Sequence, residues 1–178
     1  MEASDELLTI AELAITLTGF SGVVAAFGHQ DGLRKDERFF FVALVIVAIS
    51  TALLAFVPFI FHAAGITGSD TWKYASGTML AVAVYETLHL SYIAPTREEG
   101  RLGLVAEFVV RSLPVLILFS QIANFFGWPV APGPLLYIGG LLIWILLSGM
   151  IFVYLVTHGT VHEETTDEGP EREAMQHE

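Results

Sequence analysis

The chain lacks cysteine entirely and is poor in basic residues. Its 178 residues include 8 Lys and Arg against 19 Asp and Glu, which gives a formal net charge of −11. The absence of cysteine excludes disulfides, thiolate metal sites and a cysteine nucleophile. The shortage of basic residues argues against nucleic-acid binding, because that function needs clustered Lys and Arg on one surface.

Sequence motifs of known chemistry are missing as well. The chain contains no G-x-S-x-G, P-loop, H-E-x-x-H or dinucleotide-binding glycine motif, and no carbonyl selectivity filter. A retinal protein needs a buried lysine for its Schiff base, and Lys73 is the only lysine near an apolar run. The sequence therefore predicts a protein that is not an enzyme and that holds no cofactor.

Apolar residues are abundant and make up 54% of the chain. They form five runs long enough to cross a hydrocarbon core of about 30 Å, which takes roughly 20 helical residues. The runs cover residues 7–27, 39–62, 72–94, 104–126 and 134–157. The predicted fold is all-α: a polytopic membrane helical bundle of five transmembrane helices within residues 1–158, in a plasma membrane or bacterial inner membrane.

The links between the apolar runs predict the orientation of this bundle. Basic residues gather on the first and third links, namely Arg34, Lys35, Arg38, Arg97 and Arg101. Because positive links face the cytoplasm, the N-terminus is expected outside and the C-terminus in the cytoplasm. The acidic start MEASDELL is unlike the basic start of a signal peptide, so the first helix is expected to be retained.

Two further features fit this orientation. Four aromatic residues would lie at the outer membrane interface, where such rings are enriched: Trp72, Tyr74, Trp128 and Tyr137. Residues 159–178 are acidic and lack aliphatic periodicity, so we expect an acidic disordered cytoplasmic tail.

Polar residues inside the spans are the candidate functional residues, since intramembrane acids commonly mark ion or proton pathways. Sorting them by depth gives two layers. The outer layer comprises Glu12, His62, Gln121 and Asn124; the inner layer comprises Tyr85, Glu86, His89, Tyr92, Glu107 and Arg111. Only hydroxyl side chains lie between the layers, so no continuous charged path is visible.

The inner layer contains three candidate pairs. Glu86 and His89 form an E-x-x-H spacing that di-iron bundles use, but the spans contain no second copy, so a titrating pair is expected rather than a metal site. Arg111 has two candidate partners: Glu107, four residues before it, or Glu86 on the neighbouring antiparallel span.

Small residues and prolines indicate how the helices pack. Thr9, Glu12, Thr16 and Gly19 follow helical spacing on the first span, with Gly22 beside them. Small residues are the usual contact surface between helices in lipid, so Gly19 and Gly22 are expected to pack against another helix. Pro58 and Pro114 each leave a backbone carbonyl without its helical donor and are expected to bend their helices.

The stretch E-L-A-I-T-L-T-G-F-S-G-V-V-A-A-F-G, from Glu12 to Gly28, precedes a basic link. This pattern resembles the start of small, uncharacterised multi-span bacterial membrane proteins. The resemblance covers about one helix and implies no activity.

Two functions fit these residues, with a third behind them. One is a small homo-oligomeric channel or transporter that conducts protons or small ions through the acidic and histidine sites. The other is a non-catalytic scaffold or accessory subunit of a larger membrane complex, whose polar groups hold helices together. A haem or metal redox protein is third, because His62 and His89 are far apart along the membrane normal. Lipid, further copies and a membrane protein are the expected partners.

Overall fold

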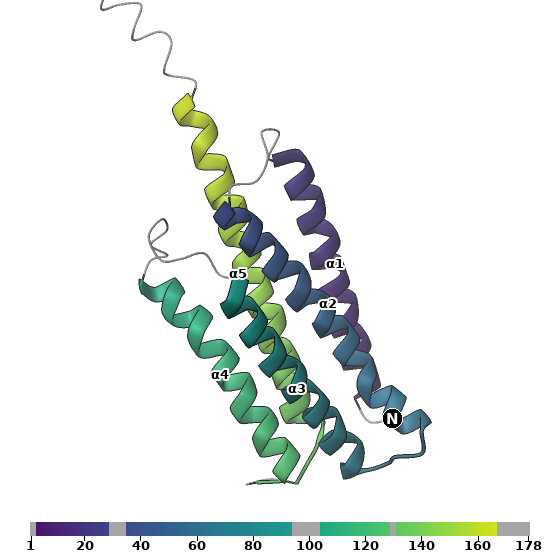
Figure 1. The fold of residues 1–178 in the computed structure, drawn as a ribbon. Helices are drawn as coiled ribbons and strands as arrows, with labels where there is room; N and C mark the ends of the chain where they lie inside the picture. The colour runs from purple at the N-terminus through teal and green to yellow at the C-terminus, as the bar shows by residue number, and fades with distance from the viewer. Residues whose placement is uncertain (1–2, 29–34, 94–103, 129–130, 167–178) are drawn as a thin grey trace, which may run out of the picture.

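The described part of the chain contains five α-helices, which alternate in direction as an antiparallel bundle (Figure 1). The computed structural model describes residues 3–28, 35–93, 104–128 and 131–166, without the side chains of 25–28, 35–37, 91, 93, 104–112 and 158–166. The helices are α1 (Ser4–Gly28), α2 (Lys35–Ala63), α3 (Ser69–Ile93), α4 (Leu104–Phe126) and α5 (Pro134–Thr166). The all-α fold and its five helices are thereby confirmed.

Local sequence signals mark the helix ends. Asp5 and Glu6 occupy the first turn of α1, where negative charge complements the helix dipole. Pro134 begins α5, a position where its missing N–H costs no helical hydrogen bond. Gly65 and Gly127 have φ of 87° and 69° and end α2 and α4, since glycine adopts this left-handed conformation without a Cβ clash.

Helix α5 is the central element of the bundle. It packs against each of the other four helices, whereas α1 lies at one edge against α2 and α5 (Figure 1). One apolar core joins residues of all five helices, including Ile10, Leu54, Met79, Ile117 and Trp144. A second, smaller cluster joins α2 and α5 around Leu44 and Ile151.

Three helices are long and apolar enough to cross a membrane within the described part of the chain. They are Ser4–Val24 of α1, Arg38–Ala63 of α2 and Pro134–Thr157 of α5; α4 contributes a shorter apolar run, Leu113–Phe126. This composition fits a membrane protein. Helix α5 continues to Thr166, past residue 158, where the acidic tail was predicted to follow the last span; residues 167–178 lie outside the described residues.

Candidate functional site

We call the end of the bundle where α1, α3 and α5 begin the N-terminal end; it also contains the α2–α3 and α4–α5 links (Figure 1). Asn124 is fully buried there, near the end of α4. Its Nδ2 donates to Ser76 Oγ of α3 at 2.7 Å and to the Gly133 carbonyl at 3.1 Å, and its Oδ1 accepts from Gly133 N at 2.9 Å. One amide side chain therefore ties α4 to both α3 and the start of α5.

Gln121 lies one turn before Asn124 and is also fully buried. Its Nε2 donates to the Leu136 carbonyl of α5 at 2.9 Å and to Ser120 Oγ at 3.1 Å. Its Oε1 has no hydrogen-bond partner among the described residues. Gln121 thus joins α4 to the first turn of α5, and the two amides predicted to share a face do so.

Close approach at Gln121 depends on a glycine of α5. A Cβ placed on Gly140 would lie 2.5 Å from Gln121 Nε2 and 2.7 Å from Met79 Cε. The neighbouring Gly139 has no atom within 4 Å of the corresponding position. Side chains of α3 and α4 therefore pack directly against the α5 backbone at Gly140, whereas Gly139 faces open space.

Tyr137 provides a third link between helices, and it does so through a proline. Pro58 has no N–H, so the Leu54 carbonyl four residues earlier lacks its helical donor. The Tyr137 hydroxyl of α5 donates to that carbonyl at 2.6 Å, and both Tyr137 and Pro58 are buried. The carbonyl that proline leaves free is thereby satisfied across the α2–α5 contact.

This arrangement differs from the interfacial position predicted for Tyr137 and Trp72. Both rings are buried between helices, and their centroids lie 6.0 Å apart. Tyr74 and Trp128 are 48% and 76% exposed, so their rings do face outward. Helix rotation explains the difference, because residues at one depth can point either into the bundle or away from it.

We expect Tyr137→Phe to lower the free energy of unfolding by about 1 kcal/mol, because it leaves a buried carbonyl without a donor. Pro58→Ala restores an N–H that can reach the Leu54 carbonyl, so Tyr137→Phe should cost less than half as much in that background. A double-mutant cycle measured by unfolding in detergent tests this coupling. Tyr74→Phe, at an exposed ring, is the control; equal costs of Tyr137→Phe in both backgrounds would contradict the account.

Glu86 is the buried acid of the described residues, with 4% of its surface exposed on α3. The Ser50 hydroxyl of α2 donates to its carboxyl group, and Oε1 has no partner among the described residues. His89 is half-buried, and its ring stacks on the Tyr85 ring with the two centroids 5.7 Å apart. The two members of the E-x-x-H pair therefore have different surroundings.

The other inner-layer residues are less fully placed. Tyr85 and Tyr92 are 67% and 89% exposed. The side chains of Glu107 and Arg111 lie outside the described residues, so the predicted pairing of Arg111 with Glu86 or Glu107 stays a prediction.

Pro114 is half-buried within α4. Ser148 of α5 is buried, and its Oγ has no partner in the described part of the chain.

Glu12 points away from the other helices. It is exposed on α1, and so are Thr9, Thr16 and Gly19, the residues predicted to share its face. No atom lies within 4 Å of a Cβ placed on Gly19 or Gly22. No described residue contacts these two glycines at that position, so the helix contact predicted for them stays a prediction.

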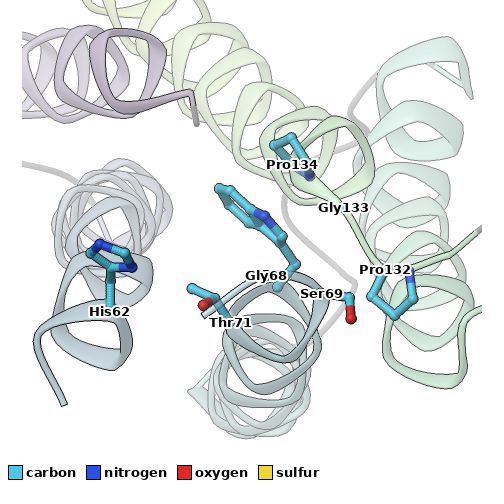
Figure 2. Close-up of a pocket in the computed structure, with 8 residues that line it drawn as sticks. His62, Gly68, Ser69, Thr71, Pro132, Gly133 and Pro134 are labelled. Carbon is cyan, nitrogen blue, oxygen red and sulfur yellow. The ribbon is translucent and has the colours of Figure 1, made fainter. Parts of the chain in front are cut away.

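His62 is exposed at the end of α2 and lines a cavity of about 280 Å³. Gly68, Ser69 and Thr71 of the α2–α3 link and α3 lie on one side of it, and Pro132, Gly133 and Pro134 lie across from them (Figure 2). Gly133, which Asn124 also holds by two hydrogen bonds, therefore belongs both to the lining of this cavity and to the Asn124 contact. The described residues contain no group of three or more His, Asp or Glu placed to hold a metal.

Comparison of the chain with protein-family models, with curated proteins and with solved structures finds no match. We therefore infer the function from the geometry of the described residues. Of the predicted outer layer, Gln121 and Asn124 lie together, His62 borders the adjacent cavity and Glu12 faces outward. Sequence reasoning missed Ser76 as the partner of Asn124 and Gly140 as the close neighbour of Gln121. It also missed Ser50 as the partner of Glu86 and Tyr137 as the donor to the Leu54 carbonyl. For Tyr137 alone a signal existed, namely the carbonyl freed by Pro58.

Proposed function

We propose that all five helices cross a cell membrane, with the N-terminus outside and the C-terminus in the cytoplasm. Helices α3 and α4 contain 25 and 23 residues, so they are about 38 Å and about 35 Å long at 1.5 Å per residue. Large apolar side chains point outward around the bundle, among them Leu53, Ile60, Phe119 and Leu135, each more than 60% exposed. A surface of this kind is suited to lipid rather than water. The basic residues on the first and third links support the orientation.

We propose further that the protein is a non-catalytic accessory subunit or scaffold of a membrane complex. The observation that carries this proposal is the use of its interior amides. Gln121 and Asn124 form hydrogen bonds between helices, and the core beside them consists of apolar residues such as Met79, Leu141 and Trp144. These two amides thus hold helices together, a role that requires no route for ions.

Conduction of protons or small ions by an assembly of copies is the second candidate, and Glu86 favours it. A buried carboxyl group with an oxygen that lacks a described partner is an unusual feature at membrane depth. Its hydrogen bond to Ser50 joins α3 to α2 and also suits a helix-packing role. The two functions differ in what they predict for transport.

Flux measured in liposomes that contain the purified protein separates the two candidates. For an accessory subunit we expect proton, Na⁺ and K⁺ flux within about twofold of empty liposomes, because the Gln121 and Asn124 amides are bonded to neighbouring helices. Glu86→Gln should leave this background unchanged. Flux at least tenfold above background would contradict the proposed function. If Glu86→Gln also abolished that flux while Glu6→Gln, at an exposed acid, preserved it, conduction through Glu86 would replace the proposal.

A further inference from the structure

The α1 outer face, defined as Thr9, Glu12, Thr16 and Gly19, is a polar surface directed away from the bundle. All four residues are exposed, although they lie within the apolar segment Ser4–Val24. Glu12 lies four residues from the midpoint of α1, residue 16, and thus about 6 Å from it along the helix on the side of the N-terminal end. In the membrane position proposed above, an ionised carboxylate would face lipid inside the hydrocarbon core, which is costly without a cation.

The basic residues of a second copy would lie at other depths than Glu12. Copies in one membrane share an orientation, so each basic residue stays at its own depth. Lys73 lies four residues after the start of α3, whereas Glu12 lies eight residues after the start of α1. The Lys73 Nζ lies 5.7 Å from the centroid of the Phe125 ring. Arg111 lies fifteen residues before the end of α4, and α4 ends at the N-terminal end of the bundle, where α1 and α3 begin. The other basic residues are Arg34, Lys35, Arg38, Arg97, Arg101 and Arg172, on links, at the start of α2 or in the tail.

The same face has room for a closely packed helix. Nothing lies within 4 Å of a Cβ placed on Gly19 or on the adjacent Gly22. Small residues permit two helix backbones to approach closely in lipid, where dispersion contacts and polar contacts drive association. Charge and shape therefore point to the same kind of partner.

We propose that the α1 outer face binds a transmembrane helix of a different protein, one that carries a lysine or arginine at the depth of Glu12. The Glu12 carboxylate accepts a charge-assisted hydrogen bond from that cation, and the helix backbone packs over Gly19. This inference rests on the proposed accessory role and names the chemistry of the partner. Because the carboxylate and the cation pair with each other, neither helix exposes an unpaired charge to lipid.

A synthetic helix serves as the probe for this site. The full chain, labelled at a single cysteine replacing the exposed Ala131, is placed in phosphatidylcholine liposomes with labelled single-span Leu/Ala peptides. One peptide has a central lysine and the other has leucine at that position. We expect energy transfer to report at least tenfold tighter association of the lysine peptide, and Glu12→Gln to remove that preference. Glu6→Gln, at an exposed acid in the first turn, should retain it.

The packing part has its own matched pair. Gly19→Leu should weaken association of the lysine peptide at least fivefold, whereas Ala81→Leu, at an exposed small residue of α3, should not. Equal binding of both peptides, or an unchanged preference in Glu12→Gln, would overturn the proposal. Energy transfer between two labelled copies that Glu12→Gln abolishes would assign the face to a second copy and would also overturn it. Ion flux would contradict the accessory role alone, so the two failures are distinct.

Discussion

Replacing Asn124 with leucine should lower the free energy of unfolding by about 3 kcal/mol. The substitution keeps a similar volume but removes both donors and the acceptor of the amide. The Gly133 N–H, the Gly133 carbonyl and the Ser76 hydroxyl then lose partners at distances of 2.7 to 3.1 Å. Each buried group left without a hydrogen bond costs about 1 kcal/mol or more. Reversible unfolding in mixed detergent micelles provides the measurement.

The matched control for Asn124→Leu is Ile122→Ala, two residues away on the same helix. Ile122 is 40% exposed, so its truncation should cost well under 1 kcal/mol. A cost of Asn124→Leu no larger than that of the control would mean that water or lipid headgroups satisfy the α4–α5 link. In that case the Asn124 amide would not hold α4 to α3 and to the start of α5.

The two adjacent glycines of α5 should respond in opposite directions to the same substitution. Gly140→Ala should destabilise the protein by about 2 kcal/mol, because its Cβ would lie 2.5 Å from Gln121 Nε2 and 2.7 Å from Met79 Cε. Gly139→Ala meets no atom within 4 Å and should stabilise the protein by about 0.5 kcal/mol through better helix propensity. Thermal unfolding of the two variants in the same detergent tests the pair.

The contrast between the glycines is informative because the substitution is identical at both sites. A movement of α5 that makes room for a methyl group at Gly140 would break the Gln121 bond to the Leu136 carbonyl, so the loss should appear either as a clash or as a lost hydrogen bond. Equal stability of Gly139→Ala and Gly140→Ala would contradict the close contact of α3, α4 and α5.

The positions of the helices were predictable because their signals are local. Apolar runs of about 20 residues separated by Gly, Pro and Asp predict helices and links, and the bounds predicted for the fourth span, 104–126, coincide with those of α4. Rotation about each helix axis was not predictable in the same way. Helix α1 is apolar on nearly every side, so its sequence does not indicate that Glu12 faces outward.

The roles of the polar residues required tertiary structure. Gln121 and Asn124 were predicted in the outer layer, on one face of their helix, as residues of an ion pathway. They do share a face of α4, where both are buried and bonded to neighbouring helices. An amide has donors and an acceptor that match a peptide group, so Asn124 can satisfy both polar atoms of Gly133. Pro58 identifies the Leu54 carbonyl as the acceptor for Tyr137 once α2 and α5 are known to be neighbours. Leu54 and Tyr137 are 83 residues apart in the sequence, so this contact is not a local signal.

The most direct test of the membrane arrangement is cysteine labelling, because the chain contains no cysteine of its own. Single replacements at Ser69 and Pro132, both at the N-terminal end of the bundle, should react with a membrane-impermeant maleimide in intact cells. Replacements at Gly32 and Gly100, in the first and third links, should react only after permeabilisation. Reversed labelling would contradict the orientation, and labelling of all four positions in intact cells would contradict insertion of the five helices in the membrane.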